Sequence, residues 1–281
     1  MKRFVFVSDF FIDQYRGGAE LTTQAIVESC KNSSERVNCQ SLTKEFIINH
    51  KDCEWIICNF SQLSDKNKIL ICKNTDYSII EYDYKFCNYR SMEKHTAAEK
   101  KECDCLEKKE AKINLIFYGY AKRIWFMSKK QMDIFVDKVA TIKGEKCKVL
   151  SSIFCPGDLS FMNSIKDNEK NNRYLVLNSD SWIKGTKEAT RFAEKNNLEY
   201  ELVSGLQYHE LLIKMSTSKG LIFRPLGSDT CPRIVIEAML LGCDLILNDN
   251  VQHRDEDWFL NRKTCNDYLD NRTKEFWNFY E

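Results

Sequence analysis

The chain of 281 residues lacks several features that would assign it to a broad class. Its formal net charge is +1, so composition provides no overall attraction to nucleic acid or to a membrane surface. No apolar run approaches the roughly 20 residues that span a bilayer, and the N-terminal run Arg3–Ser8 is too short for a signal peptide. Only three prolines are present, and abundant Lys, Asn and Ile favour an AT-rich, viral genome. We therefore expect a cytoplasmic protein, in the host cytoplasm if the gene is viral.

The thirteen cysteines include no C-x-x-C pair, which is the spacing most typical of zinc sites. Their number is odd, their spacing is irregular, and Cys103-Asp-Cys105 is the only close pair. Several, such as Cys58 and Cys72, lie in apolar runs, as is typical of small buried side chains. We therefore expect reduced thiols and no metal site.

What is present is the pattern of a globular α/β protein, with 43% hydrophobic and 30% charged residues and length enough for two domains. In the N-terminal half, short apolar runs alternate with helical stretches. The expected strands are Arg3–Ser8, Trp55–Phe60, Ile69–Cys72, Ile124–Met127 and Lys148–Leu150, and the helix after Gly17-Gly18 is expected to bury Leu21, Ala25, Ile26 and Cys30. The charged segment Glu93–Lys112 is either a solvated surface helix or a nucleic-acid contact.

The second half repeats this organisation after Cys155-Pro-Gly-Asp158 and the polar stretch Asn163–Asn172, which predict a boundary between domains at 1–156 and 157–281. A C-terminal helix rich in aromatic residues is expected to cross back from the second domain to the first. The expected strands are Tyr174–Asn178, Tyr200–Ser204, Gly220–Arg224 and Asp244–Asn248, with helices at Thr186–Asn196, His209–Ser216 and after Asp229. Such alternation predicts parallel sheets covered on both faces. Ligands of these folds bind at the carboxyl ends of strands, so the cleft between the lobes is the expected site.

The most informative segment is Asp229-Thr-Cys-Pro-Arg-Ile-Val-Ile-Glu237, with two carboxylates eight residues apart. Pro232 is suited to the first position of a helix that Gly242 would end. Thr230 or Cys231 would then cap the helix, and the residues expected to pack inward are Ile234, Ile236, Ala238 and Leu241. Free backbone N–H groups at a helix start favour phosphate, and nearby carboxylates accept hydrogen bonds from sugar hydroxyls. The segment therefore predicts a site for a sugar nucleotide.

Three further motifs accompany this segment in a meaningful order. Gly17-Gly18-Ala-Glu follows the first strand, Lys184-Gly185 follows the first strand of the second half, and Glu237-Ala-Met-Leu-Leu-Gly continues toward the last strand. Together they resemble the retaining glycosyltransferases of family 4, with Asp229 replacing the first Glu of the family's E-x7-E motif. The resemblance implies the GT-B fold of two facing Rossmann-like domains with parallel sheets. The residues around Glu81–Phe86, Arg90 and Asp257–Phe259 also resemble small, often phage-encoded members.

The resemblance implies a role for each motif residue of the second half. Glu237 would accept hydrogen bonds from the donor ribose, and Asp229 would bind hydroxyls of the transferred sugar. Lys184 would neutralise the departing diphosphate. Arg233 would offer a guanidinium fork to that diphosphate, since Pro232 replaces the Gly of many members and removes an N–H. The alternative for Lys184 is an exposed turn lysine, and for Arg233 a solvated residue early in a helix.

In the first half, Gly17 and Gly18 would leave room for the donor, or would simply form a strand-to-helix turn. Asp83 stands nearest the place of a catalytic-region His that is common in the family. Asp83, Lys85 and Arg90 would hold the acceptor or the donor sugar, or would form a surface ion-pair group.

The implied activity is the transfer of a sugar from a UDP- or GDP-linked donor to an acceptor hydroxyl, with retention of configuration and without a metal or cofactor. The acceptor would be a glycan or a lipid-linked sugar, or a modified DNA base if the gene is viral. One alternative is a catalytically silent protein that binds nucleotide sugars or glycans, favoured by Asp229 and by the absence of a basic residue just before Lys184. Another is an epimerase of the same fold.

Overall fold

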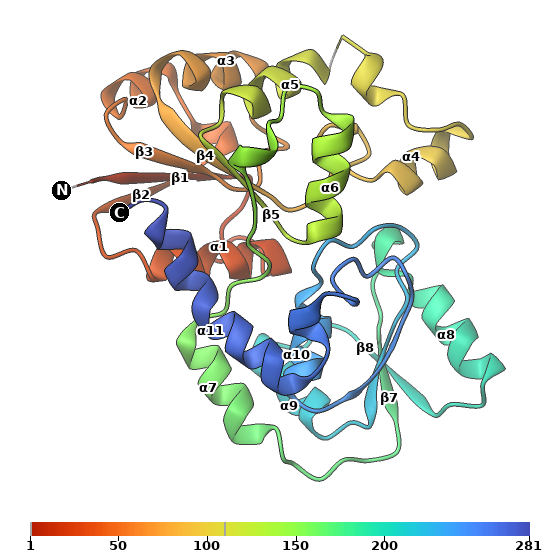
Figure 1. The fold of residues 1–281 in the computed structure, drawn as a ribbon. Helices are drawn as coiled ribbons and strands as arrows, with labels where there is room; N and C mark the ends of the chain where they lie inside the picture. Colours follow the sequence, from red (N-terminus) through yellow and green to blue (C-terminus); the bar gives the residue numbers. More distant parts are fainter. Residues whose placement is uncertain (1, 110) are drawn as a thin grey trace. The chain divides into compact units, whose positions relative to one another are not determined.

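The computed structural model describes residues 2–109 and 111–281, which form two compact units (Figure 1). The first unit comprises the chain up to Ile153 together with Thr273–Glu281, and the second comprises Phe154–Arg272. Each unit is built on one parallel β-sheet with helices between the strands. The α/β class expected from the sequence is confirmed. Among the described residues, we find no helix that is both long and apolar enough to cross a bilayer.

The first unit has a six-stranded sheet in the order β2-β1-β3-β4-β5-β6. Its strands are β1 (Phe4–Ser8), β2 (Ser34–Asn38), β3 (Glu54–Ile57), β4 (Asp76–Glu81), β5 (Arg123–Phe126) and β6 (Cys147–Val149). Its helices are α1 (Gly18–Glu28), α2 (Lys44–Asn49), α3 (Asp65–Asn74), α4 (Met92–Glu99), α5 (Ala111–Tyr120) and α6 (Lys129–Lys138). Figure 1 shows α2, α3 and α5 together on one face of this sheet and α1 on the other. The central strands are consequently buried on both faces, as parallel sheets require.

One strand prediction for the first unit is wrong, and two strands were missed. Ile69–Cys72 belongs to helix α3, which Ser64 caps by accepting a hydrogen bond from the Asn67 N–H at 3.2 Å. Within it Ile71 is fully buried and Ile69 is 40% exposed, as one turn of a surface helix places them. Strands β2 and β4 were not predicted. In helix α1 the buried face carries Thr22 and Thr23 besides Ala25 and Ile26, while Leu21 is half-buried. Cys30 lies beyond the end of the helix and is also half-buried.

The charged segment Glu93–Lys112 is not one surface helix. Helix α4 ends at Glu99, because Lys100 adopts a left-handed conformation with φ of 57°. A short 3-10 turn, η2 (Cys105–Glu107), follows before α5. The side chains of His95 and Cys105 are buried, so part of the segment is packed away from solvent. Glu110 lies outside the described residues.

The second unit has a four-stranded parallel sheet in the order β10-β9-β7-β8. Its strands are β7 (Tyr174–Leu177), β8 (Tyr200–Val203), β9 (Gly220–Phe223) and β10 (Asp244–Leu247), and its helices include α7 (Pro156–Ile165), α8 (Thr186–Lys195), α9 (Tyr208–Ser216) and α10 (Arg233–Leu240). All four strands agree with the sequence-based prediction to within one residue at each end. Helix α7 begins at Pro156, so the segment expected as a boundary starts a helix.

Helix α10 begins one residue later than predicted. Pro232 is the cap, with an extended ψ of 114°, and Arg233 is the first helical residue. Gly242 ends the helix as expected, with a left-handed φ of 68°. Ile236, Ala238 and Leu241 are fully buried as predicted, whereas Ile234 is only half-buried and Val235 takes its place in the core.

Helix α11 (Arg262–Asn278) contributes residues to both units, because the chain from Thr273 onward belongs to the first. The ring of Phe4 lies 5.1 Å from Trp277, and Trp125 lies 5.2 Å from Phe276, between ring centroids. The Trp277 indole N–H donates to Ser29 Oγ at 2.9 Å. Phe276 is fully buried. The first unit is therefore made from two separate segments of the chain.

Candidate active site

In the second unit Lys184 and Asp229 lie in contact, although 45 positions separate them in the sequence. Lys184 Nζ donates to Asp229 Oδ2 at 2.8 Å. Lys184 ends the short turn η4 (Trp182–Lys184) after β7, and Asp229 lies beyond β9, the neighbouring strand. Their side chains are 33% and 12% exposed. The sheet thus brings both predicted residues to its carboxyl edge, where α/β folds bind ligands.

The backbone around this ion pair is fixed by close packing. Gly185 has a φ of 66°, and a Cβ there would lie 2.0 Å from the carbonyl oxygen of Arg224. Only glycine therefore lets the turn approach the end of β9 so closely. The Asp229 N–H donates to the Asn250 carbonyl at 2.8 Å, and the Gln252 N–H donates to the Asp229 carbonyl at 3.1 Å. These contacts hold Lys184 and Asp229 at fixed positions on the sheet edge.

Glu237 and Arg233 form a buried ion pair one turn apart on α10. Arg233 Nε donates to Glu237 Oε1 at 3.2 Å, and their side chains are 4% and 3% exposed. The Tyr208 hydroxyl donates to Glu237 Oε1 at 2.8 Å and accepts from Arg233 Nη2 at 3.1 Å. The guanidinium carbon of Arg233 lies 3.7 Å from the ring centroid of Phe154, a cation–π distance. Arg233 is therefore enclosed by protein groups, and the solvated alternative for this residue is wrong.

Burial controls the electrostatics of this cluster. It raises the pKa of Glu237, although Arg233 and the hydrogen bond from Tyr208 oppose the rise. Burial and the charge of Glu237 raise the pKa of the Tyr208 hydroxyl, which therefore stays protonated near neutral pH. Burial alone would lower the pKa of Arg233, but Tyr208 and Glu237 outweigh it and raise the value. Asp158 Oδ2, at 3.7 Å from Arg233 Nη2, adds a second carboxylate that sequence reasoning missed.

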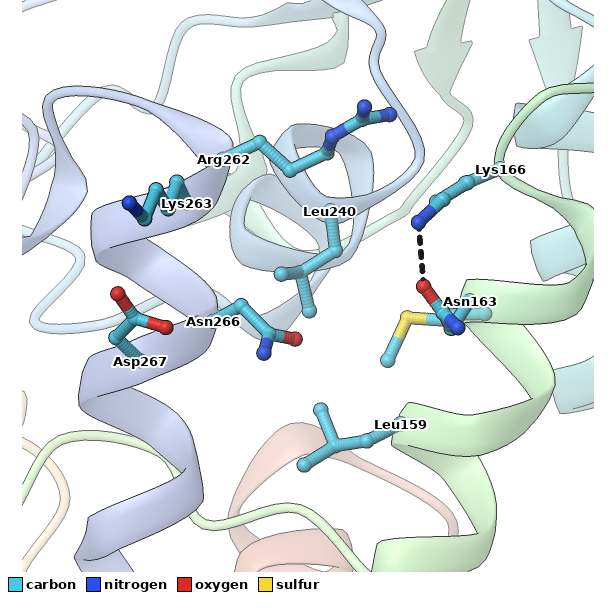
Figure 2. A pocket seen from close by; sticks show the side chains of 9 residues that line it. Leu159, Asn163, Lys166, Leu240, Arg262, Lys263, Asn266 and Asp267 are labelled. Atoms are coloured by element: carbon cyan, nitrogen blue, oxygen red, sulfur yellow. Dashed lines mark hydrogen bonds between the residues drawn. The ribbon is translucent and has the colours of Figure 1, made fainter.

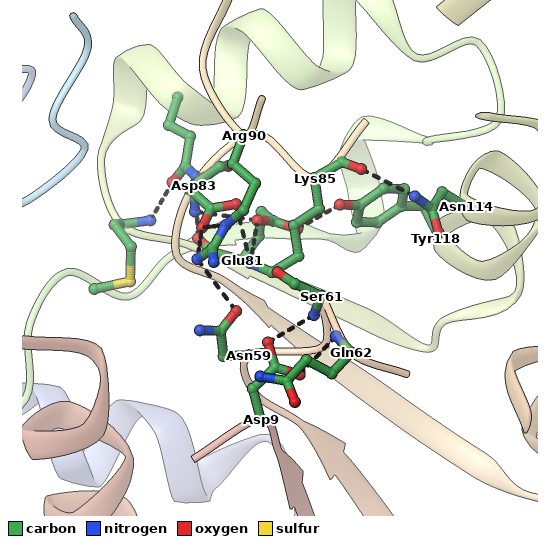
Figure 3. A network of polar contacts seen from close by, with 12 residues as sticks. Asp9, Asn59, Ser61, Gln62, Glu81, Asp83, Lys85, Arg90, Asn114 and Tyr118 are labelled. Carbon is green, nitrogen blue, oxygen red and sulfur yellow. Dashed lines mark hydrogen bonds and ion pairs between the residues drawn. The ribbon is translucent and has the colours of Figure 1, made fainter. Parts of the chain in front are cut away.

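In the first unit Asp83, Lys85 and Arg90 belong to one polar network (Figure 3). Lys85 Nζ donates to Glu81 Oε1 at 2.9 Å and to Asp83 Oδ1 at 3.1 Å. Arg90 Nε donates to Asp83 Oδ2 at 2.7 Å. Glu81 is the last residue of β4, is fully buried, and also accepts a short hydrogen bond from the Tyr118 hydroxyl. Because Lys85 is 5% exposed, this is no loose surface ion-pair group.

The pKa values of the two carboxylates in this network, Glu81 and Asp83, shift in opposite directions. Burial raises the pKa of Glu81 despite the charge of Lys85. Burial would also raise the pKa of Asp83, but the charges of Lys85 and Arg90 outweigh it and lower the value. The side chain of Asp83, the carboxylate with the lowered pKa, is one-fifth exposed at the carboxyl end of the sheet.

The predicted glycine loop lies at the start of α1, where Gly17 is the cap and Gly18 is the first helical residue. Gly17 is extended, with a φ of −107°, so its lack of a side chain matters for space. A Cβ there would lie 2.6 Å from Glu20 Oε2. The Glu20 carboxylate accepts from the backbone of Gly17, and burial raises its pKa. Glu20 was not among the predicted site residues, although it completes the Gly17-Gly18-Ala-Glu motif.

Two hollows in the described part of the second unit matter because of their position, and neither is lined by a predicted site residue. One, of about 250 Å³, lies between α7, α10 and α11 (Figure 2). Its lining residues are Leu159, Met162, Asn163, Lys166, Leu240, Arg262, Lys263, Asn266 and Asp267. The other, of about 360 Å³, is lined by Arg224, Leu247, Asn248, Asp249, Asn250 and Arg254. Because the Asn250 carbonyl accepts from the Asp229 backbone, this second hollow adjoins the candidate site. Several of its lining residues directly follow strand β10, and polar residues after a strand are the sequence signal that could have indicated this hollow.

Comparison with known proteins gives no family model and no curated protein that matches the sequence. Solved structures do match. HepE of Anabaena, in complex with UDP and glucose, is 11% identical with a TM-score of 0.56, over 98% of this chain and 96% of that one. AviGT4, a glycosyltransferase involved in avilamycin A biosynthesis, is 8% identical with a TM-score of 0.55, over 99% and 93%. An α-glucosyltransferase in complex with UDP and a DNA 13-mer containing an HMU base is 10% identical with a TM-score of 0.51, over 98% and 91%.

These neighbours are glycosyltransferases of the GT-B fold, and at such identities the likeness concerns the fold alone. UDP-GlcNAc 2-epimerases also match, at TM-scores of 0.47 to 0.50. The two parallel α/β units and the three glycosyltransferase neighbours together confirm the predicted fold class: the chain is a GT-B protein built from two Rossmann-like domains.

Proposed function

We propose that the chain is a retaining glycosyltransferase of family 4, which moves a sugar from a UDP- or GDP-linked donor to an acceptor hydroxyl. The observation that carries the proposal is the contact between Lys184 and Asp229 at the carboxyl edge of the second sheet. These are the two residues that the motif resemblance assigns to the diphosphate and to the transferred sugar. The neighbours solved with UDP or UDP-glucose support a donor of this class.

In this proposal the 157–281 domain binds the donor and the 1–156 domain provides the acceptor side. The donor's diphosphate takes the ammonium of Lys184, which frees the Asp229 carboxylate to accept hydrogen bonds from sugar hydroxyls. Glu237 accepts from the donor ribose while Arg233 and Tyr208 hold its carboxylate in place. The ion pair of Lys184 and Asp229 keeps both charges satisfied before the donor arrives.

The reaction breaks the bond between the anomeric carbon and the diphosphate oxygen and forms a bond from the same face to the acceptor oxygen. The acceptor proton passes to the departing diphosphate, so no protein base is needed. Lys184 stabilises the negative charge that develops on that diphosphate. We propose no metal or cofactor for this step.

The acceptor is proposed to be a glycan or a lipid-linked sugar, or a modified DNA base if the gene is viral. In either case Asp83, Lys85 and Arg90 are the proposed contacts for acceptor or sugar, because they lie at the carboxyl end of the first sheet. The dependence of activity on salt concentration distinguishes a DNA acceptor from a small sugar acceptor. Activity on DNA should fall steeply as salt rises, because phosphate contacts release counterions, whereas activity on a small sugar should not.

A second candidate function is a catalytically silent protein that binds nucleotide sugars. The observation that favours it is again the ion pair, because Asp229 is one methylene shorter than the Glu of the motif and Lys184 already satisfies it.

The test is a panel of UDP-, GDP-, ADP- and CMP-sugars, read first by thermal shift and then by nucleotide release. We expect one donor to raise the melting temperature and to release nucleotide. The variant Lys184→Met should lose release, while Lys187→Met, at an exposed position on α8, should retain it. Binding without transfer or hydrolysis would favour the silent protein, and an altered sugar nucleotide would indicate an epimerase. If no donor shifts the melting temperature, the proposal is wrong.

A further inference from the structure

Four side chains in the first unit place potential metal ligands in one small cluster. The ligand atoms of Cys87, His95, Cys103 and Cys105 all lie within 4.8 Å of one another. Cys87 comes from the loop after β4, His95 from helix α4, and Cys105 from the turn η2. Three of the four residues are buried and Cys103 is half-buried. All four belong to the charged segment between β4 and α5 or to the loop that leads into it.

The three separations among Cys87, His95 and Cys105 match the edges of a tetrahedral metal site, and Cys103 Sγ lies within 4.8 Å of the other ligand atoms. Cys105 Sγ lies 3.9 Å from Cys87 Sγ, and His95 Nδ1 lies 3.4 Å and 3.8 Å from the sulfurs of Cys105 and Cys87. Zinc bonds of about 2.3 Å to sulfur and about 2.05 Å to nitrogen put two sulfurs about 3.8 Å apart and a sulfur and nitrogen about 3.6 Å apart. The observed separations agree with these edges to about 0.2 Å. A disulfide between Cys87 and Cys105 would instead need sulfurs about 2.05 Å apart.

A carboxylate stands near the other nitrogen of His95, just beyond hydrogen-bond distance. His95 Nε2 lies 3.6 Å from Asp104 Oδ1, and this nitrogen has no hydrogen-bond partner among the described residues. Metal-binding histidines usually donate this second N–H to a carboxylate, and a bond from His95 Nε2 to Asp104 would fix the tautomer that leaves Nδ1 free to bind a metal. Asp104 in turn contacts Lys101 Nζ at 2.6 Å and Lys108 Nζ at 3.0 Å. These two cations offset the negative charge that three thiolates and one Zn²⁺ would carry.

We propose that Cys87, His95, Cys103 and Cys105 form a structural zinc site. A closed set of three thiolates and one imidazole is typical of structural zinc and leaves no position for a substrate. On binding, the three thiols lose their protons to solvent, and each sulfur and Nδ1 donate an electron pair to the metal. This site revises the expectation of no metal, which depended on the missing C-x-x-C spacing.

The metal fixes a segment that carries part of the polar network. Cys87 is two residues after Lys85 and three before Arg90. The loop between them is tight, since the Arg90 N–H donates to the Cys87 carbonyl at 2.9 Å and Arg90 itself has a φ of 58°. A metal bound to Cys87 therefore limits the movement of the two cations that hold Asp83. Zinc thereby stabilises the carboxyl edge of the first sheet without contacting it.

The first measurement is the metal content of the full-length chain, purified without chelator, by inductively coupled plasma mass spectrometry. We expect about one zinc per chain, as for a single closed site. Cys103→Ser should lose most of that zinc, while Cys72→Ser, which changes an equally half-buried cysteine outside the cluster, should retain it. Full zinc content in Cys103→Ser, or a stoichiometric metal other than zinc, would overturn the proposal.

Two further measurements keep the test independent of how well Cys103→Ser folds. Asp104→Asn leaves all four ligands in place and should weaken zinc binding by about 10- to 100-fold in competition with a chromogenic chelator. Cobalt(II) added to metal-free wild-type protein should give the intense visible absorption of tetrahedral cobalt bound to thiolates. Wild-type protein that contains no zinc and shows no such absorption would overturn the site.

Discussion

The buried pair of Arg233 and Glu237 allows a quantitative prediction about stability. Glu237→Ala removes the carboxylate and leaves the guanidinium of Arg233, which is 5% exposed, without its main counter-charge. Breaking a buried ion pair in this way costs about 3–5 kcal/mol. Tyr208 and Asp158 still contact Arg233, so we expect a value near the lower limit, about 3 kcal/mol. For a unit of this size that loss lowers the melting temperature by roughly 10 °C.

Two further variants isolate the charge from the packing. Glu237→Gln retains an oxygen that can accept from Tyr208 and Arg233, and should lose less stability than Glu237→Ala. The double variant Arg233→Met with Glu237→Leu removes both charges and should recover most of the loss, because apolar side chains replace a buried pair at little cost. Urea denaturation followed by circular dichroism measures the midpoints, with an unchanged slope as the control. If the double variant loses the sum of the single losses, the two residues are uncoupled and the reasoning is refuted.

Three other predictions concern the second unit. Gly185→Ala should lose markedly more stability than Gly205→Ala in urea denaturation, because both glycines have a positive φ but only at Gly185 would the new Cβ meet backbone, at 2.0 Å from the Arg224 carbonyl oxygen; equal losses would contradict the close approach. Burial lowers the pKa of His253 to about 3, whereas the pKa of an unfolded His is about 6.5. As pH drops below about 6.5 the unfolded chain binds a proton that the folded chain does not, so the free energy of unfolding falls by up to about 1.4 kcal/mol per pH unit. His253→Phe should flatten the dependence of the urea midpoint between pH 5 and 6.5, and an unaltered slope would contradict it. Lys184→Met should lower kcat by about 10²–10³-fold in nucleotide release if the lysine stabilises the departing diphosphate, and kcat equal to that of wild type would refute this role.

The secondary structure of the second half could be predicted because its strands are short and mostly apolar, and alternate regularly with polar, helix-forming segments. The first half was harder. Strand β2, Ser34–Asn38, lies at the sheet edge with polar and half-exposed side chains, so it has no hydrophobic pattern to detect. Ile69–Cys72 is a short apolar run, which by periodicity alone fits a buried strand or one face of a helix equally well. Tertiary packing and the cap at Ser64 decide for the helix.

The proximity of predicted site residues can be anticipated where they follow neighbouring strands, because parallel strands end at a common edge. Lys184 and Asp229 were singled out by motif resemblance, and the shared strand edge explains why the fold brings them into contact. The sequence does not indicate the partners of Arg233. Tyr208 and Asp158 belong to other helices, and only tertiary packing brings them to Arg233. The cysteine cluster was missed for a related reason, since its spacing has no close C-x-x-C pair and its geometry depends on the turn at Lys100.

The division of α11 between the units has a consequence for how the chain folds as it is synthesised. Phe276 and Trp277 pack against Trp125 and Phe4, so the N-terminal sheet cannot complete its core when Ile153 has been translated. The ribosome must first add the 119 residues Phe154–Arg272, which takes roughly 6–24 s at about 5–20 residues per second. During that interval the second-made unit can fold before the first-made one is finished. The N-terminal unit is thus made first but completed last, which reverses the usual order of folding during synthesis. Until Phe276 and Trp277 are added, the apolar surface around Phe4 and Trp125 stays exposed to chaperones.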